Sequence, residues 1–135
     1  MWQSWLNAST LPALEQSAAF AQKRHLVLTG NIANIDTPGY QTRDLAVDKF
    51  HDALKSAIDK PTEAVDRYGD PIVPKTMEQV RDVSNQVLYH DGSDVSLEEQ
   101  VTEISKNQGM HDMSISLMRS QFRTLQIAIQ GSVAV

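Results

Sequence analysis

The chain has 135 residues, a net charge of −5 and no cysteine. The lack of cysteine excludes disulfides, thiolate zinc sites and cysteine nucleophiles. The lack of any lysine- and arginine-rich stretch argues against binding to nucleic-acid phosphates. The first basic residue is Lys23 and no apolar run reaches about 18 residues, so we expect neither a cleaved secretory signal peptide nor a membrane span.

Residues 1–40 are predicted to hold an N-terminal arm, a helix and a turn. The helix is expected from about Leu11 to Asn34, with Thr10 as its cap and Pro12 tolerated in its first turn. Apolar residues, together with one histidine, recur along this helix in steps of four and three. This spacing is typical of the narrow stripe of a coiled coil. The stripe consists of Leu14, Ala18, Ala21, His25, Leu28, Ile32 and Ile35.

The helix is followed by a strong stop signal, Thr37-Pro38-Gly39-Tyr40. Pro38 disfavours helical geometry at the residue before it. Proline followed by glycine suits the centre of a type II turn, because glycine adopts positive φ there.

Residues 41–93 are predicted to be rich in loops. One short amphipathic helix is expected from about Asp44 to Ile58, and Pro61 ends it. Pro71 and Pro74 argue against regular structure nearby. A short strand is expected at 86–90, before the turn signal at 91–92.

Residues 94–135 are predicted to form the longest helix. Ser96 and Glu99 make a capping box at its start, and Gly131 is expected to stop it. The stripe along it again alternates steps of four and three. Its members are Leu97, Val101, Ile104, Gln108, His111, Ile115, Met118, Phe122, Leu125 and Ile129.

The predicted fold is therefore mainly α, with two long terminal helices that pair as a coiled-coil-like bundle and a loop-rich middle segment. We expect the pair to be antiparallel, with Leu28 or Ile32 against residues 115–125. Such long helices with narrow stripes are not stable alone in water. Apolar residues off the stripes would stay exposed in a two-helix pair, so the pattern implies contact with further subunits.

The residues indicate no catalytic, cofactor-binding or metal site. The four histidines, His25, His51, His90 and His111, match no metal-binding spacing. His25 and His111 fall on the two stripes, where they are expected to pack. The alternative, a zinc site shared by them, lacks a further ligand on the same faces. No phosphate-binding or nucleophile-elbow motif is present.

The segment from Asn31 to Tyr40 resembles the flagellar rod and hook family. That family carries an A-N-x-x-T-P-G-Y signature just after its N-terminal helix. The fixed positions are matched by Ala33, Asn34, Thr37, Pro38, Gly39 and Tyr40. The resemblance implies that these residues form an assembly motif.

Two further segments resemble one member of the proximal rod. They are Asp91 to Gln100, with the pattern D-G-x-x-V-x-L-E-E-Q, and Leu125 to Gly131. The other proximal rod protein, FlgC, usually carries an R-A-Y-E-A-N-like run where this chain has Gln108 to Met113. A FlgC-like protein remains an alternative, and the stripes alone would also permit a soluble coiled-coil adaptor or chaperone.

The resemblance implies a structural, non-enzymatic subunit of the proximal rod, placed in the periplasm and exported through the flagellar type III apparatus. It would transmit torque from the motor ring to the hook and filament. Its partners would be copies of itself, FlgC-like and FlgF-like rod subunits, a FliE-like rod-base adaptor and the MS-ring. No cofactor, nucleic acid or small-molecule substrate is expected. The assembly helices would contribute Leu14, Leu28, Ile32, Leu97, Val101, Ile104, Ile115, Met118, Phe122, Leu125 and Ile129.

Overall fold

The computed structural model describes residues 9–59, 75–89 and 96–133. Within these ranges the chain is mainly helical, as the sequence predicts. Two short strands accompany the helices. In chain order the elements are α2 (Leu11–Ala33), β1 (Arg43–Leu45), α3 (Val47–Asp59), α4 (Lys75–Val83), β2 (Val87–Tyr89) and α5 (Leu97–Val133).

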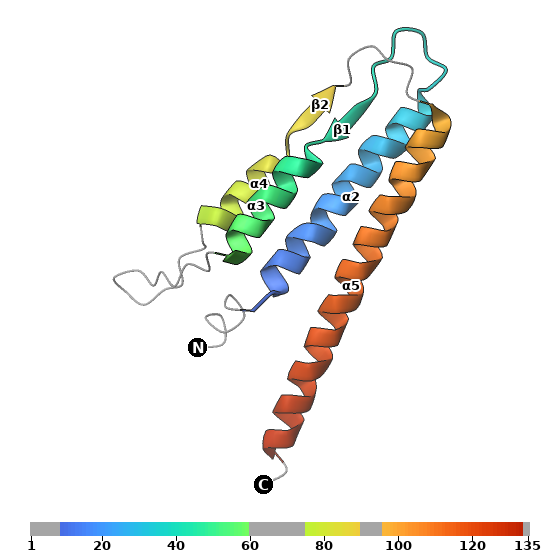
Figure 1. Ribbon diagram of the computed structural model, residues 1–135. Coiled ribbons are helices and arrows are strands. Elements are labelled where there is room, and N and C mark those ends of the chain that lie inside the picture. Colours follow the sequence, from blue (N-terminus) through green and yellow to red (C-terminus); the bar gives the residue numbers. More distant parts are fainter. Residues whose placement is uncertain (1–8, 60–74, 90–95, 134–135) are drawn as a thin grey trace.

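The two long helices α2 and α5 lie side by side and run in opposite directions (Figure 1). The antiparallel pairing of the terminal helices is therefore confirmed. α2 sits in the middle of the molecule, with α5 on one side and the shorter helices α3 and α4 on the other. The C-terminal end of α5 continues well past the start of α2. Among the described residues, no helix combines the length and apolarity that crossing a membrane requires.

The apolar core lies between α2 and the two short helices. The rings of Phe20 and Phe50 are both fully buried and stack with their centroids 3.9 Å apart. Leu45 from β1, Ala57 from α3 and Val80 from α4 complete the buried cluster. The main buried apolar cluster thus joins α2 to the middle segment, and Met110 of α5 packs against it.

The middle segment contains more regular structure than the sequence predicts. The expected short helix and strand are confirmed as α3 and β2. β1 and α4 were missed: β1 pairs with β2 as an antiparallel ladder, and α4 starts directly after Pro74. The inference from Pro74 was wrong because a proline at the start of a helix removes no hydrogen bond. Pro61, Pro71 and the expected turn at 91–92 lie outside the described residues.

The helix ends are capped partly as expected. Thr10 occupies the N-cap of α2, but the side-chain bond comes from Ser9, whose Oγ accepts from the Leu11 N–H at 3.3 Å. At α5 the Ser96 Oγ accepts from the Glu99 N–H at 3.2 Å, which is one half of the predicted capping box. Gly131 does not stop the helix, because α5 continues to Val133 and the residue keeps a negative φ.

Candidate assembly surface

The Thr-Pro-Gly-Tyr segment forms the predicted turn. Gly39 has φ of 76°, and the Tyr40 N–H donates to the Thr37 carbonyl at 3.1 Å. These are the features of a type II turn with proline and glycine at its centre. Asn34 links the turn to the helix, because its side-chain amide donates to the Gly30 carbonyl at 2.8 Å while its own carbonyl accepts from the Thr37 N–H at 2.9 Å.

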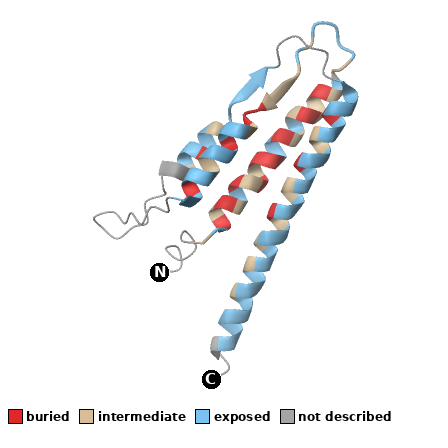
Figure 2. Ribbon diagram, viewed as in Figure 1, coloured by how far each residue is buried: buried red, intermediate tan, exposed pale blue. Residues whose placement is uncertain are grey.

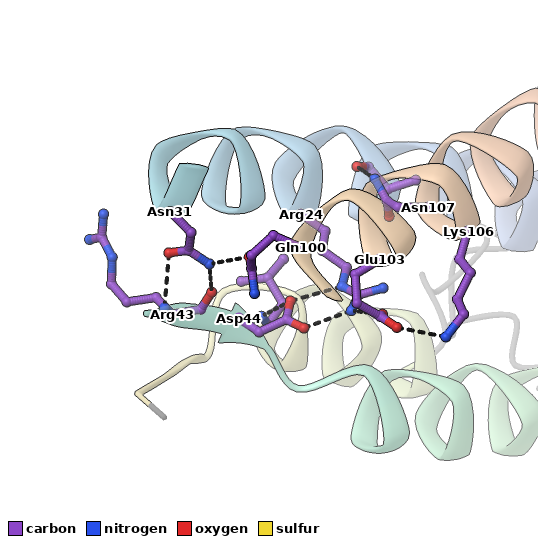
Figure 3. Close-up of polar contacts among 10 residues, drawn as sticks. Arg24, Asn31, Arg43, Asp44, Gln100, Glu103, Lys106 and Asn107 are labelled. Carbon is purple, nitrogen blue, oxygen red and sulfur yellow. Dashed lines mark hydrogen bonds and ion pairs between the residues drawn. The ribbon is translucent and has the colours of Figure 1, made fainter. Parts of the chain in front are cut away.

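Asn31, in the last turn of α2, ties the Thr37–Tyr40 turn to the rest of the molecule (Figure 3). Its Oδ1 accepts from the Tyr40 hydroxyl at 3.1 Å and from the Arg43 N–H at 3.0 Å. Its Nδ2 donates to the Arg43 carbonyl at 2.6 Å and to Gln100 Oε1 of α5 at 3.0 Å. One buried amide therefore joins α2, the turn, β1 and α5.

Arg24 makes a second polar joint at the middle of α2 (Figure 3). Its guanidinium donates to both carboxylate oxygens of Asp44, at 2.8 and 2.6 Å, and to Glu103 Oε2 at 2.7 Å. Lys106 donates to the other Glu103 oxygen at 2.7 Å. Arg24 is buried, and such a charge is tolerated only when it is paired and hydrogen-bonded, as it is here.

The charged forms of Arg24 and Glu103 are favoured in this joint. Hydrogen bonds from Lys106 and from Arg24 lower the pKa of Glu103, against a smaller opposing effect of burial. Burial is the largest single effect on Arg24 and disfavours its charged form, but the hydrogen bonds to Asp44 and Glu103 and the negative charges of these carboxylates together raise the pKa of the guanidinium. Both shifts favour the charged forms of Arg24 and Glu103, which strengthens the ion pair between them.

The α2–α5 contact is held by polar residues at regular intervals. On α5 these residues recur every seven positions, and their partners run back along α2. Gln100 accepts from Asn31, Asn107 Nδ2 donates to the Ala21 carbonyl at 2.7 Å, and Ser114 donates to Ser17 Oγ at 3.0 Å. Gln121 Nε2 donates to Thr10 Oγ1 at the far end. We call Gln100, Asn107, Ser114 and Gln121 the polar line of α5.

The polar line sets a different register from the predicted one. Asn31 lies opposite Gln100, so Leu28 and Ile32 lie beside the first turns of α5 and not beside residues 115–125. That part of the prediction was wrong. The reason is that hydrogen-bonded side chains, which a search for apolar periodicity passes over, determine how the two helices align.

The predicted α2 stripe faces inward. Ala18, Ala21 and Leu28 are buried, and Leu14, His25, Ile32 and Ile35 are half-buried. Most of α5 is exposed, and its buried and half-buried residues are scattered along its length (Figure 2). The predicted α5 stripe is accordingly divided between half-buried and exposed members. Five members are half-buried along α2, namely Ile104, His111, Ile115, Met118 and Leu125.

The other half of the α5 stripe points to solvent, which corrects the expectation that the whole stripe packs within the chain. Leu97, Val101, Phe122 and Ile129 are 50, 49, 56 and 53% exposed, and Gln108 between them is exposed too. We call the four apolar residues the exposed α5 stripe. Met113, Leu117 and Ile127 add further exposed apolar side chains on the same helix. So much apolar surface on one helix is typical of an interface with another protein.

A groove of about 830 Å³ lies between α5, the β1–α3 corner and β2. Its floor is the Arg24 joint, and Met110 and Tyr89 are among its apolar walls. Its principal charged groups are already bonded to one another, which suits a structural joint. The described residues contain no group of three or more histidine, aspartate or glutamate residues placed to hold a metal ion.

The exposed α5 stripe runs along the whole of α5, so only its first half lies near the motif. The motif stands at the C-terminal end of α2, beside the start of α5 where Leu97 and Val101 lie, whereas Phe122 and Ile129 lie toward the other end of α5. Sequence reasoning missed Arg24, Asn31 and the polar line. The available signal was the seven-residue recurrence of polar side chains at the contact face of α5.

Comparisons with known proteins point to one family. The chain is 30% identical over 114 residues to flagellar basal body rod protein FlgB of Aquifex aeolicus, covering 83% of this chain and 86% of that protein. It is 28% identical over 129 residues to FlgB of Bacillus subtilis, covering 93% and 97%, and 28% identical over 124 residues to FlgB of Escherichia coli, covering 81% and 84%. No protein-family model matches the chain. No solved structure matches it either.

Proposed function

Because this chain belongs to the FlgB family of flagellar basal body rod proteins, we propose that it is a structural subunit of the proximal rod that assembles by helix packing and transmits torque from the motor ring to the hook and filament. The observation that carries the assembly role is the exposed α5 stripe. Its four apolar side chains are each about half exposed although they follow a coiled-coil spacing.

The energetics favour contact between subunits. Fully burying one leucine, valine or phenylalanine side chain contributes about 1.5–3 kcal/mol. Covering the remaining exposed half of four such side chains therefore supplies several kcal/mol per interface, before the cost of association. Within the chain, the polar line already satisfies the α2–α5 contact, so a neighbour can use the stripe without opening the subunit.

The motif turn would serve assembly indirectly. Asn31 and the turn fix where the chain leaves α2 and where β1 and the apolar core sit relative to α5. In a regular lattice, an error in the shape of the subunit recurs in every copy. A rigid joint at this point keeps the exposed α5 stripe at a fixed position and orientation relative to the apolar core. Ala33, Asn34, Thr37, Pro38, Gly39 and Tyr40 are assigned this role in the proposal.

The finer partners and location belong to the same proposal. Neighbours would be further copies, FlgC-like and FlgF-like rod subunits, a FliE-like adaptor at the rod base and the MS-ring. The rod would stand in the periplasm, and the chain would reach it through the flagellar type III apparatus without a cleaved signal peptide. The relatives are flagellar basal body rod proteins, which supports a location in the basal body.

The test introduces a charge into the exposed α5 stripe. Val101→Asp and Phe122→Asp are each expressed in a strain of the source organism that lacks its own copy of the gene. We expect folded, exported protein but no swimming in soft agar and no complete rods in isolated basal bodies, because a carboxylate cannot be buried unpaired in an interface.

Ser116→Asp is the matched control, since Ser116 is exposed on the same helix but off the stripe. It should swim normally. Circular dichroism of the purified variants checks that both stripe variants keep their helix content. Normal swimming with complete basal bodies in both stripe variants would show that the stripe is not an assembly surface.

A further inference from the structure

A line of four residues, three of them charged, borders the exposed α5 stripe, and its charge changes sign along the helix. Glu98, Ser105, Asp112 and Arg119 recur every seven positions, so they follow one edge of the stripe. Glu98, Asp112 and Arg119 are all exposed. The edge is therefore acidic toward the start of α5 and basic toward its end.

The other side of the stripe carries no acidic residue, lysine or arginine. It is formed by the half-buried row Ile104, His111, Met118 and Leu125 and, beyond that row, by the polar line, whose members Gln100, Asn107 and Ser114 are buried against α2. In a parallel helix pair, the charged edge of one helix would face this neutral, covered edge of the other. In an antiparallel pair related by a two-fold axis, the charged edge faces its own copy. Only the antiparallel arrangement sets Glu98 of one copy beside a charge of opposite sign.

We propose that two free copies of this chain pair through the exposed α5 stripe as a closed antiparallel dimer, with Glu98 of each copy against Arg119 of the partner subunit. In this register Leu97 lies beside the partner's Phe122, and Val101 lies beside the partner's Ile115. Apolar residues thus meet apolar residues on both sides of the axis. The interface is isologous, so both ion pairs form at once.

Gln108 supports the same register. It is the polar member of an otherwise apolar series, and it falls at the two-fold axis when Glu98 faces the partner's Arg119. A glutamine amide both donates and accepts hydrogen bonds, so it is complementary to its own copy. A single polar residue inside an apolar seam is a known means of fixing register and orientation.

The dimer would compete with assembly. A closed two-fold pair covers the stripe and cannot add further subunits through it, whereas a rod lattice continues in one direction. Free subunits would thereby be kept from polymerising through the stripe. This consequence rests on the proposed rod function, but the dimer itself does not.

Single cysteines test the geometry, because the natural chain contains none. Gln108→Cys should form a disulfide-linked dimer readily under mild oxidation, since the two thiols meet at the axis. Phe122→Cys alone should not, because the partner's Phe122 lies far along the helix. A mixture of Leu97→Cys and Phe122→Cys proteins should form the mixed dimer.

Charge reversal tests the ion pairs by sedimentation equilibrium of the full chain in low-salt buffer. Glu98→Arg and Arg119→Glu should each weaken dimerisation at least tenfold, and the double variant should recover most of the loss. The two residues lie about 32 Å apart along one helix at 1.5 Å per residue, so recovery can arise only between copies. Both side chains are exposed, and circular dichroism confirms that the fold is kept.

Three results would overturn the dimer: a monomer over the whole concentration series, disulfide formation by Phe122→Cys as fast as by Gln108→Cys, or no recovery in the double variant. The rod assay above separates the two proposals. Loss of rods in Phe122→Asp together with a monomeric wild-type chain refutes only the dimer. A dimer together with normal rods in both aspartate variants refutes only the rod role of the stripe.

Discussion

Replacing Asn31 with alanine should destabilise the monomer more than any other single change in the motif region. The side chain is 1% exposed and takes part in four hydrogen bonds to three different segments. Its removal leaves Gln100 Oε1 without its donor in a buried position, and it also removes the partners of the Arg43 backbone groups and the Tyr40 hydroxyl. Gln100 is buried, whereas Arg43 and Tyr40 are half-buried and can regain water.

The expected cost follows from this difference. A buried group left without its partner costs about 1–3 kcal/mol, and each bond whose groups can be rehydrated contributes about 0.5–1.5 kcal/mol. Allowing for partial relaxation, Asn31→Ala should lower the free energy of unfolding by about 2–4 kcal/mol. That is a large share of the roughly 5–15 kcal/mol typical of a folded domain.

Urea unfolding followed by circular dichroism measures this quantity. Asn34→Ala is the matched control, since Asn34 is half-buried and its side chain donates one bond to the Gly30 carbonyl. It should cost about 1 kcal/mol. A double-mutant cycle of Asn31→Ala with Tyr40→Phe should give a coupling of about 0.5–1.5 kcal/mol. An Asn31→Ala cost no larger than that of Asn34→Ala would refute the role of Asn31 as the joint.

Further changes test the core, the turn, the long helix and the ion network. Phe50→Ala should cost about 3–5 kcal/mol of unfolding free energy, whereas Phe122→Ala should change it by less than about 0.5 kcal/mol, because only Phe50 is buried. Gly39→Ala should cost on the order of 1 kcal/mol because of the positive φ of this residue, although no atom lies within 4 Å of the added Cβ. Gly109→Ala should instead stabilise α5 by about 0.5–1 kcal/mol, because alanine favours a helix more than glycine does and the added Cβ again meets no atom within 4 Å. The pKa of Glu103 in the folded chain lies below its ordinary value of 4.5. The stability that its ion pairs contribute is therefore complete above that pH and is lost as the pH falls through the folded-state pKa. Urea unfolding in this acid range should show the free energy of unfolding falling less steeply with pH in Glu103→Gln than in the natural chain.

The sequence predicts the parts of the fold that depend on local chemistry. The Pro38–Gly39 turn, the start of α5 at Ser96 and the extent of α2 each follow from residues within one turn of the chain, and each is found in the structure. β1 and α4 were missed for the opposite reason. β1 has three residues and depends on its partner β2, and α4 contributes Val80 to a core formed by distant segments.

The packing face of α5 could not be read from apolar spacing. An apolar stripe shows which side of a helix avoids water, but it does not show whether the chain itself or a neighbour covers that side. Here the chain covers the side marked by the polar line, through bonds to Asn31, Ala21 and Ser17. The apolar residues of the exposed α5 stripe, which point away from α2, are left about half exposed.

Polar residues at seven-residue intervals exclude most wrong registers between α2 and α5. A slip by one turn would place each polar side chain opposite an apolar one and leave its hydrogen bonds unmade, which is costly in a buried position. A slip by seven positions would bring polar residues together again, so the polar line alone is not sufficient. The Arg24–Glu103 ion pair and the Asn31–Gln100 bond exclude that slip, because Arg24 and Asn31 are also bound to Asp44 and Arg43 of β1. The position of the exposed α5 stripe along the helix axis, relative to the apolar core, is thereby fixed in the monomer. Regular packing of copies through the stripe requires this fixed position.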